Sequence, residues 1–149
     1  MEAVSQELSR PALKTYVADA VALARYFEDA LPPKANRAFL EAERGEAQIL
    51  VPEIVVGEFI YIALKGRLDK EKISDPKATI TELLDEMESS TYLKQVQMDA
   101  RSWRHFLGST VSELHDRMVH AIAASLPSDS SPAIITNDPT LSAVFKTLW

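Results

Sequence analysis

Short segments rich in β-branched and apolar residues alternate with longer amphipathic segments along most of the chain. The short segments have the length and composition of buried strands: Lys14–Ala18, Ala47–Val51, Thr91–Val96 and Ala133–Thr136. The longer segments carry apolar residues at helical spacing. Strands that alternate with helices are typical of a parallel sheet covered on both faces. The sequence therefore predicts an α/β fold of three layers.

The predicted helices lie between and after these strands. They are Ala20–Ala30, Lys34–Arg44, Pro52–Lys65, Lys77–Ser89, Met98–Leu107, Glu113–Leu126 and Asp138–Phe145. Asp99 and Ser112 are predicted to cap the helices that follow them. The helix after Ser112 has a predicted inner stripe of Leu114, Met118, Val119, Ile122 and Leu126. Because the connections of such a sheet are right-handed, the strand carboxyl ends share one edge, where ligands bind.

Length and composition favour one globular domain over residues 14–149, preceded by a loose arm at residues 1–13. The absence of cysteine excludes disulfides and a thiolate zinc site. No apolar run is long enough to span a bilayer or to serve as a signal peptide, so we expect a cytoplasmic protein without membrane contact. The formal net charge of −6 argues against nonspecific nucleic-acid binding through a broad basic face.

Carboxylates fall at positions where an unpaired charge would be costly to bury. Asp19 directly follows the first predicted strand, and Asp138 lies two residues after the fourth. Glu58 is embedded in an otherwise strongly apolar helix, and Asp116 lies in the first turn of another. Taken singly, Asp138 is also explained as a helix cap and Asp116 as a partner of its helix dipole.

A cation would let these carboxylates coexist. Two carboxylates about 4 Å apart repel by roughly 4 kcal/mol at an effective dielectric near 20. Oxygen ligands without sulfur favour Mg²⁺ or Mn²⁺. Such an ion activates water as a nucleophile and stabilises the charge of a reacting phosphate.

The order of these residues resembles the PIN-domain family, particularly its VapC-like toxin branch. The likeness extends from Lys14 to about Phe145. The segments that carry it are YVADAVAL, ILVPEIVVGEF, ELHDRMVHAIAASL and AIITNDPTL, which hold Asp19, Glu58, Asp116 and Asp138 in turn. Each motif is weak alone, but the four in this order are fairly specific.

The resemblance implies a PIN-like three-layer α/β/α fold with a central parallel sheet of four to five strands. It implies a metal-dependent endoribonuclease in which Asp19, Glu58, Asp116 and Asp138 hold Mg²⁺ or Mn²⁺ and a metal-activated water cleaves RNA. Thr136 would orient the site. As a toxin, the chain would bind a small antitoxin near the Glu58 helix and the helix after it. Homodimerisation is a further expectation from the family.

The chain departs from the family beside its first carboxylate. The family usually has Ser, Thr or Asn two residues after that Asp, where this chain has Val21, and Ala20 replaces a frequent Thr. The alternative is therefore a catalytically weakened PIN-like module for protein interaction or RNA binding. A haloacid-dehalogenase-type phosphatase needs an Asp in place of Val21. A receiver domain needs an acidic pair and a late Lys that the chain lacks at matching positions.

Cationic and aromatic residues near these motifs give secondary predictions. Arg117 would contact an RNA phosphate or pair with a neighbouring acid. The cluster of Lys65, Arg67 and Lys70 is either an ordinary solvated loop or a patch that steers phosphates. His115 is either a partner of the carboxylates or an ordinary partly buried histidine. The aromatic residues are predicted to belong to the core rather than to stack on bases; they are Tyr92, Trp103 and Phe106.

Overall fold

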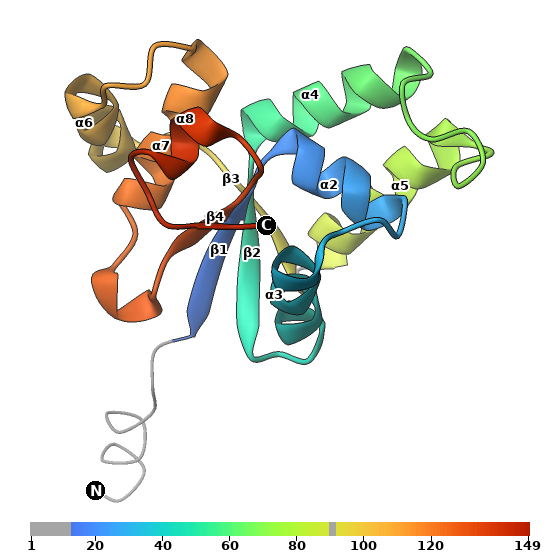
Figure 1. The fold of residues 1–149 in the computed structure, drawn as a ribbon, viewed down its shortest axis with the longest axis horizontal. Helices are drawn as coiled ribbons and strands as arrows, with labels where there is room; N and C mark the ends of the chain where they lie inside the picture. The colour runs from blue at the N-terminus through green and yellow to red at the C-terminus, as the bar shows by residue number, and fades with distance from the viewer. Residues whose placement is uncertain (1–12, 90–91) are drawn as a thin grey trace, which may run out of the picture.

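The computed structural model describes residues 13–89 and 92–149. The predicted arm lies outside this part of the chain except for Leu13. The described strands form one sheet in the order β3-β2-β1-β4-β5, and all neighbouring pairs are parallel (Figure 1). The strands are β1 Lys14–Ala18, β2 Ala47–Pro52, β3 Leu93–Val96, β4 Ala133–Ile135 and β5 Thr147–Leu148. The predicted parallel sheet of four to five strands is confirmed.

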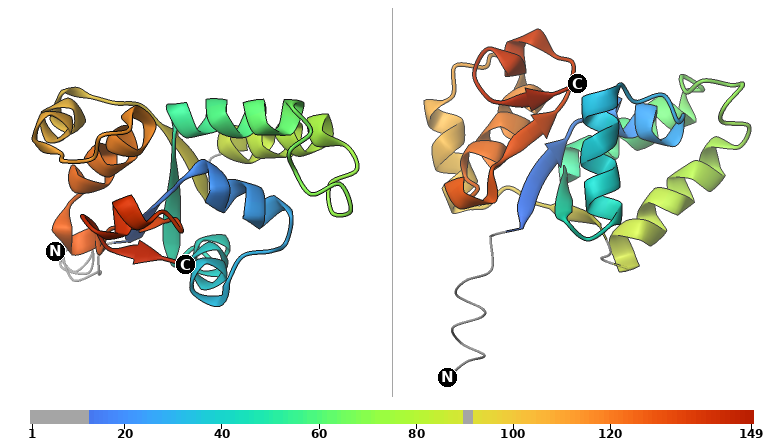
Figure 2. Two further views of the ribbon diagram at one scale, coloured as in Figure 1. Left: turned by 45° about the horizontal axis from the view of Figure 1, so that its top comes forward. Right: turned by 60° about the horizontal axis from the view of Figure 1, so that its bottom comes forward.

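Helices cover both faces of the sheet (Figures 1 and 2). Helix α3 packs against β2 and β5, whereas α7 packs against β1 and β4. The three-layer α/β/α arrangement is therefore confirmed. The described helices are α2 Ala20–Phe27, α3 Pro33–Glu43, α4 Glu53–Leu64, α5 Pro76–Ser89, α6 Ala100–Gly108, α7 Leu114–Ala124 and α8 Pro139–Ser142, with a 3₁₀ turn at Ser128–Ser130.

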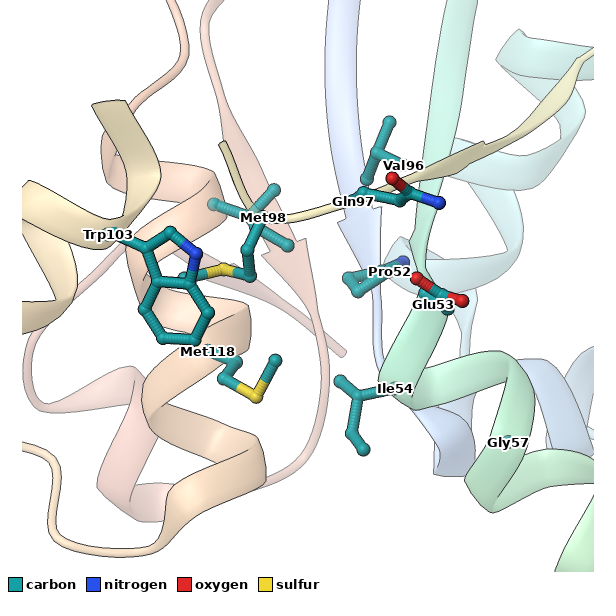
Figure 3. Close-up of a pocket in the computed structure, with 10 residues that line it drawn as sticks. Pro52, Glu53, Ile54, Gly57, Val96, Gln97, Met98, Trp103 and Met118 are labelled. Atoms are coloured by element: carbon teal, nitrogen blue, oxygen red, sulfur yellow. The ribbon is translucent and has the colours of Figure 1, made fainter. Parts of the chain in front are cut away.

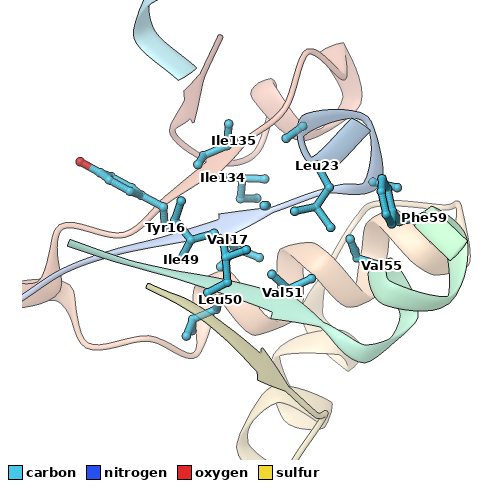
Figure 4. Close-up of a cluster of buried hydrophobic side chains, with 14 of the residues drawn as sticks. Tyr16, Val17, Leu23, Ile49, Leu50, Val51, Val55, Phe59, Ile134 and Ile135 are labelled. Carbon is cyan, nitrogen blue, oxygen red and sulfur yellow. The ribbon is translucent and has the colours of Figure 1, made fainter. Parts of the chain in front are cut away.

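The core lies where the central strands are buried on both faces. Nearly every residue of β1 and β2 is buried, because helices cover both sides of these strands. Figure 4 shows Val17, Ile49 and Val51 from these strands with Leu23 of α2 and Phe59 of α4. Strand β3 is half exposed, because it lies at an edge of the sheet. This core fixes the strand ends that carry the acidic residues.

Several helix boundaries differ from those predicted. Helix α2 ends at Phe27 because Glu28 turns inward and Asp29 adopts a left-handed φ of 53°. Helix α8 stops at Ser142 because the chain turns into β5. The predicted cap Ser112 is wrong: Glu113 caps α7, and its Oε2 accepts the Asp116 N–H at 2.6 Å. The predicted cap Asp99 is confirmed, in a capping box with Ser102.

Two predictions about buried apolar side chains are also wrong. Leu114, placed in the inner stripe of α7, is 55% exposed because it is the first residue of the helix and precedes the packed turns. Trp103, expected in the core, is 45% exposed. None of the helices in the described ranges has the length and apolar character that a bilayer span requires.

Candidate active site

The carboxyl ends of β1 and β4 meet at the point where the order of the strands reverses. The chain passes from β1 to β2 and β3 on one side of the sheet, then to β4 on the other side of β1. Ala18 pairs with Ile135, and the Asp19 N–H donates to the Ile135 carbonyl at 3.3 Å. Ligands of open α/β sheets bind in the crevice at such a reversal. Asp19, Thr136 and Asp138 follow these two strands.

Asp19 is fixed through both oxygens of its carboxylate. Oδ1 accepts the Ala22 N–H at 2.8 Å and so caps α2, and Oδ2 accepts the Thr136 hydroxyl. Burial raises the pKa of Asp19, and these hydrogen bonds oppose that rise. The charge of Asp138 raises the pKa further. The side chain is therefore rigidly oriented and lies within electrostatic reach of a second acid.

Thr136 connects the ends of the two strands. Its side chain is almost fully buried, and its hydroxyl donates to Asp19 while accepting the Asp138 N–H at 3.0 Å. Asp138 in turn caps α8, because its Oδ1 accepts the N–H groups of Thr140 at 2.7 Å and Leu141 at 3.4 Å. One hydroxyl thus orients the Asp19 carboxylate and also holds the backbone N–H of Asp138.

The pKa of Asp116 is strongly raised. Burial comes first among the causes that raise its pKa to about 7, followed by the negative charges of Asp138 and Glu113. A hydrogen bond with Asp138 and the charge of Asp19 act in the same direction. Helix α7 thus places a carboxylate beside those at the ends of β1 and β4, where like charges disfavour its ionisation.

Glu58 is half-buried on α4 and lies beside α7. His115 Nδ1 is 3.4 Å from Glu58 Oε1 and 3.9 Å from Glu113 Oε1. Burial raises the pKa of Glu58, His115 opposes the rise, and the charges of Glu113 and Asp19 add to it. The four predicted acids therefore influence one another. Glu113 was not predicted as part of the site, although its spacing of three residues from Asp116 is that of a helix cap.

The donor chemistry of this cluster fits a hard divalent cation, because its side-chain ligands are carboxylate oxygens that repel one another. Among the described residues, no three Asp, Glu or His side chains are gathered as a ready metal cage. Mg²⁺ commonly keeps several waters and takes only one or two carboxylates from the protein. The carboxylates therefore suit a hydrated ion that takes one or two of them as ligands better than a closed, fully protein-liganded site.

Two of the cations predicted to bind substrate, Arg117 and Lys65, have partners within the protein. The Arg117 guanidinium donates to the backbone carbonyls of Phe106 at 2.8 Å, Leu107 at 3.3 Å and Val111 at 3.4 Å. Arg117 therefore anchors α7 to α6 instead of presenting itself to a phosphate. Lys65 lies at the end of α4 with its ammonium 5.4 Å from the centre of the Tyr61 ring. Lys65 and Arg67 are both exposed, about two helical turns beyond Glu58.

An apolar groove adjoins the acids. One cavity of about 400 Å³ lies between the start of α4, the end of β3 and helices α6 and α7 (Figure 3). Trp103, Met98 and Met118 line one side, and Ile54 lies opposite. A second cavity, of about 260 Å³, shares Ile54 and Gly57 and extends to Glu58, Tyr61 and His115. Because the two cavities share these α4 residues, they form one groove along α4.

Comparison with known proteins supports the fold. No protein-family model matches the sequence, and no curated protein matches it. Among solved structures, the chain is similar to one in the crystal structure of VapBC2 from Rickettsia felis bound to a DNA fragment from their promoter. The TM-score is 0.58 over 91% of this chain and 99% of that one. At 15% sequence identity, the likeness establishes a shared PIN-like α/β fold and leaves the activity to be tested.

Proposed function

We propose that this chain is a metal-dependent endoribonuclease of the VapC-like toxin kind, which hydrolyses RNA phosphodiester bonds. The observation that carries the proposal is the carboxylate cluster at the strand reversal, where burial, followed by the charges of Asp138 and Glu113, raises the pKa of Asp116 to about 7. Folding brings these like charges together at a partly buried position. A bound cation would relieve that repulsion. The fold shared with the VapBC2 chain supports the toxin assignment.

The residues of the site would have different roles. Asp19, Asp116 and Asp138 would hold Mg²⁺ or Mn²⁺, and Glu58 would do so directly or through water. When bound, the ion would supply Lewis acidity and lower the pKa of a water molecule. Thr136 keeps one Asp19 oxygen oriented, because its hydroxyl donates a hydrogen bond to that oxygen. His115 holds Glu58 in place across the gap between α4 and α7.

The competing function is a weakened PIN-like module that binds RNA or protein without cleavage. Its supporting observation lies beside Asp19: Val21 is 38% exposed and offers no hydroxyl to the carboxylate or to a bound ion. A hydroxyl there would orient a metal ligand, and the loss of such a partner commonly lowers metal affinity 10- to 100-fold, as an order of magnitude. The two functions differ in whether added metal produces cleavage.

The deciding experiment measures cleavage of labelled single-stranded RNA while Mn²⁺ or Mg²⁺ is titrated into the protein. We expect cleavage that depends on the metal and that falls by more than about 100-fold in Asp19→Asn. Asp29→Asn is the matched control, because Asp29 is exposed at the far end of α2 and its left-handed φ suits Asn.

Absence of cleavage at every metal concentration would refute the nuclease and favour the binding module. Cleavage that survives in Asp19→Asn would refute the site while leaving the activity. A loss in Asp29→Asn equal to that in Asp19→Asn would point to general damage and would also count against the site.

The proposed toxin binds a small antitoxin through the groove along α4. The groove presents Trp103, Ile54 and Met118 to solvent from three elements, which suits an apolar side of an extended or helical segment. This groove runs along α4, the Glu58 helix near which the antitoxin is expected, and α5, the helix after it, packs on α4. A homodimer is the second partner we propose, and the molar mass in solution tests it.

We expect Ile54→Asp to abolish co-purification with the proposed antitoxin. An aspartate in an apolar interface would be desolvated without a partner and would weaken binding by at least 10-fold, roughly. Leu84→Asp is the control on α5, where Leu84 is 42% exposed and lines neither cavity of the groove. Loss of binding in Leu84→Asp alone would move the partner to the α5 side.

A further inference from the structure

A second, polar cleft lies on the α3 side of the sheet. It has a volume of about 510 Å³ and is bordered by α3, by the start of β1 and by β5 with the residue before it. Four cationic side chains and one carboxylate are among the residues that line it: Lys14, Lys34, Arg37, Lys146 and Glu41. Such a gathering contrasts with the net charge of −6 on the whole chain.

The single carboxylate of the cleft is already engaged. Glu41 Oε2 lies 2.9 Å from Lys14 Nζ, and Glu41 Oε1 accepts the Tyr16 hydroxyl at 3.2 Å. Lys34, Arg37 and Lys146 are exposed. Within the described part of the chain they have no ion pair or hydrogen bond through their side chains. Three positive charges thus face one cleft without compensation, which suits a ligand with several negative charges.

One side of the cleft reaches the carboxyl end of β5. Leu148 lines it and pairs with Ile135, and the Leu148 carbonyl accepts the Thr136 N–H at 3.2 Å. At its other end is Lys14, five residues before Asp19, or about 16 Å along an extended strand. A chain molecule that reaches the acidic cluster could therefore run beside β5 and enter the cleft.

We propose that this cleft binds the phosphate backbone of the RNA strand whose cleavage the acidic cluster catalyses. The inference rests on the proposed nuclease function. Lys34, Arg37 and Lys146 would each neutralise one phosphate, and the planar guanidinium of Arg37 suits a bidentate contact. The acids repel RNA in the absence of metal, so these cations would hold the strand near a site that otherwise disfavours it.

The test measures binding of a fluorescently labelled single-stranded RNA over a range of salt concentrations, with EDTA present to prevent cleavage. The test variant is Lys34→Gln/Arg37→Gln/Lys146→Gln. Each cation that neutralises a phosphate contributes about 0.7 to the slope of log affinity against log salt. We therefore expect the magnitude of the slope to be about 2 lower in the variant than in the wild type. When salt is lowered from about 200 to 50 mM, the affinity of the variant should then rise roughly 20-fold less than that of the wild type.

The matched control is Lys72→Gln/Lys77→Gln/Lys94→Gln. It removes the same charge from exposed lysines on the α5 side and on edge strand β3. Equal losses in the two triple variants would overturn the cleft and indicate a diffuse effect of net charge. Tighter binding of labelled polyglutamate than of RNA at the cleft would also overturn it, in favour of an acidic protein partner.

The same proteins separate this inference from the proposed function. RNA cleavage by the wild type with Mn²⁺, combined with unchanged RNA binding by the test variant, would overturn the cleft and leave the nuclease standing. RNA binding that depends on the three cations, without cleavage at any Mn²⁺ concentration, would support the cleft and overturn the nuclease.

Discussion

Asp116→Asn is expected to abolish metal-dependent RNA cleavage and yet to stabilise the metal-free protein above neutral pH. The two effects share one cause. Asp116 sits beside Asp138 with Glu113 and Asp19 nearby, so its ionisation is disfavoured in the fold and becomes useful only when a cation is present. Asparagine keeps the shape of the side chain and removes the charge. We expect cleavage to fall by more than about 100-fold, since loss of even an outer partner of a metal site costs 10- to 100-fold.

The pH dependence of this stabilisation follows from the direction of the pKa change. Asp116 has a pKa of about 7 in the fold, against 3.8 as its ordinary value. Between these values the folded chain retains a proton that the unfolded chain releases, so the free energy of unfolding falls as pH rises from about 4 to 7. Because the side chain is partly exposed, solvent screening limits the loss to about 1–2 kcal/mol. Asp116→Asn removes this loss.

Chemical denaturation at pH 5 and pH 8, with and without Mg²⁺, measures the effect. We expect the wild type to lose stability at the higher pH and to regain it with Mg²⁺, because binding to the folded state alone stabilises it. The Asp116→Asn variant should show neither the loss of stability at pH 8 nor the gain of stability with Mg²⁺. Asp129→Asn, an exposed acid in the loop before β4, is the control and should behave as the wild type. A variant with wild-type pH dependence would contradict the proximity of these carboxylates.

Local sequence predicted the sheet well because its strands carry their own signals. Lys14–Ala18 has the predicted bounds, and the structure has a strand at Leu93–Val96, within the third predicted strand. Helix ends were harder to predict. Glu28 ends α2 by turning into the protein, where its side chain accepts the Asp69 N–H at 2.7 Å. The neighbouring sequence of Glu28 contains no sign of a partner about forty residues away.

The acidic residues could be placed at an edge of the sheet from sequence, but their individual environments could not. The sequence around Glu58 gives no ordinary reason for a charge on an apolar helix. The structure supplies one in His115, which reaches it from α7 across the tertiary interface. Arg117 likewise looks available for substrate from its place beside Asp116, although its guanidinium is taken up by three carbonyls. Such pairings depend on how two helices pack, which local patterns do not contain.

Thr136→Val is expected to weaken both metal binding and the fold. Valine has nearly the shape of threonine but lacks the hydroxyl that donates to Asp19 and accepts the Asp138 N–H. Both partners would lose a hydrogen bond in a buried place, at about 1–3 kcal/mol for a group left unsatisfied. The Thr136 hydroxyl also opposes the rise in the pKa of Asp19 caused by burial. Without it the Asp19 carboxyl would keep its proton to higher pH, and an ion requires the carboxylate.

Calorimetric titration with Mn²⁺ across a range of pH provides the measurement. We expect Thr136→Val to bind the metal roughly 10- to 100-fold more weakly, with part of the loss recovered as pH rises and Asp19 ionises. Thr136→Ser, which keeps the hydroxyl, should remain close to the wild type. A loss in Thr136→Val that does not change with pH would mean that the hydroxyl serves only packing. In that case the serine variant should lose affinity as well, because it lacks the methyl group that fills the same buried space.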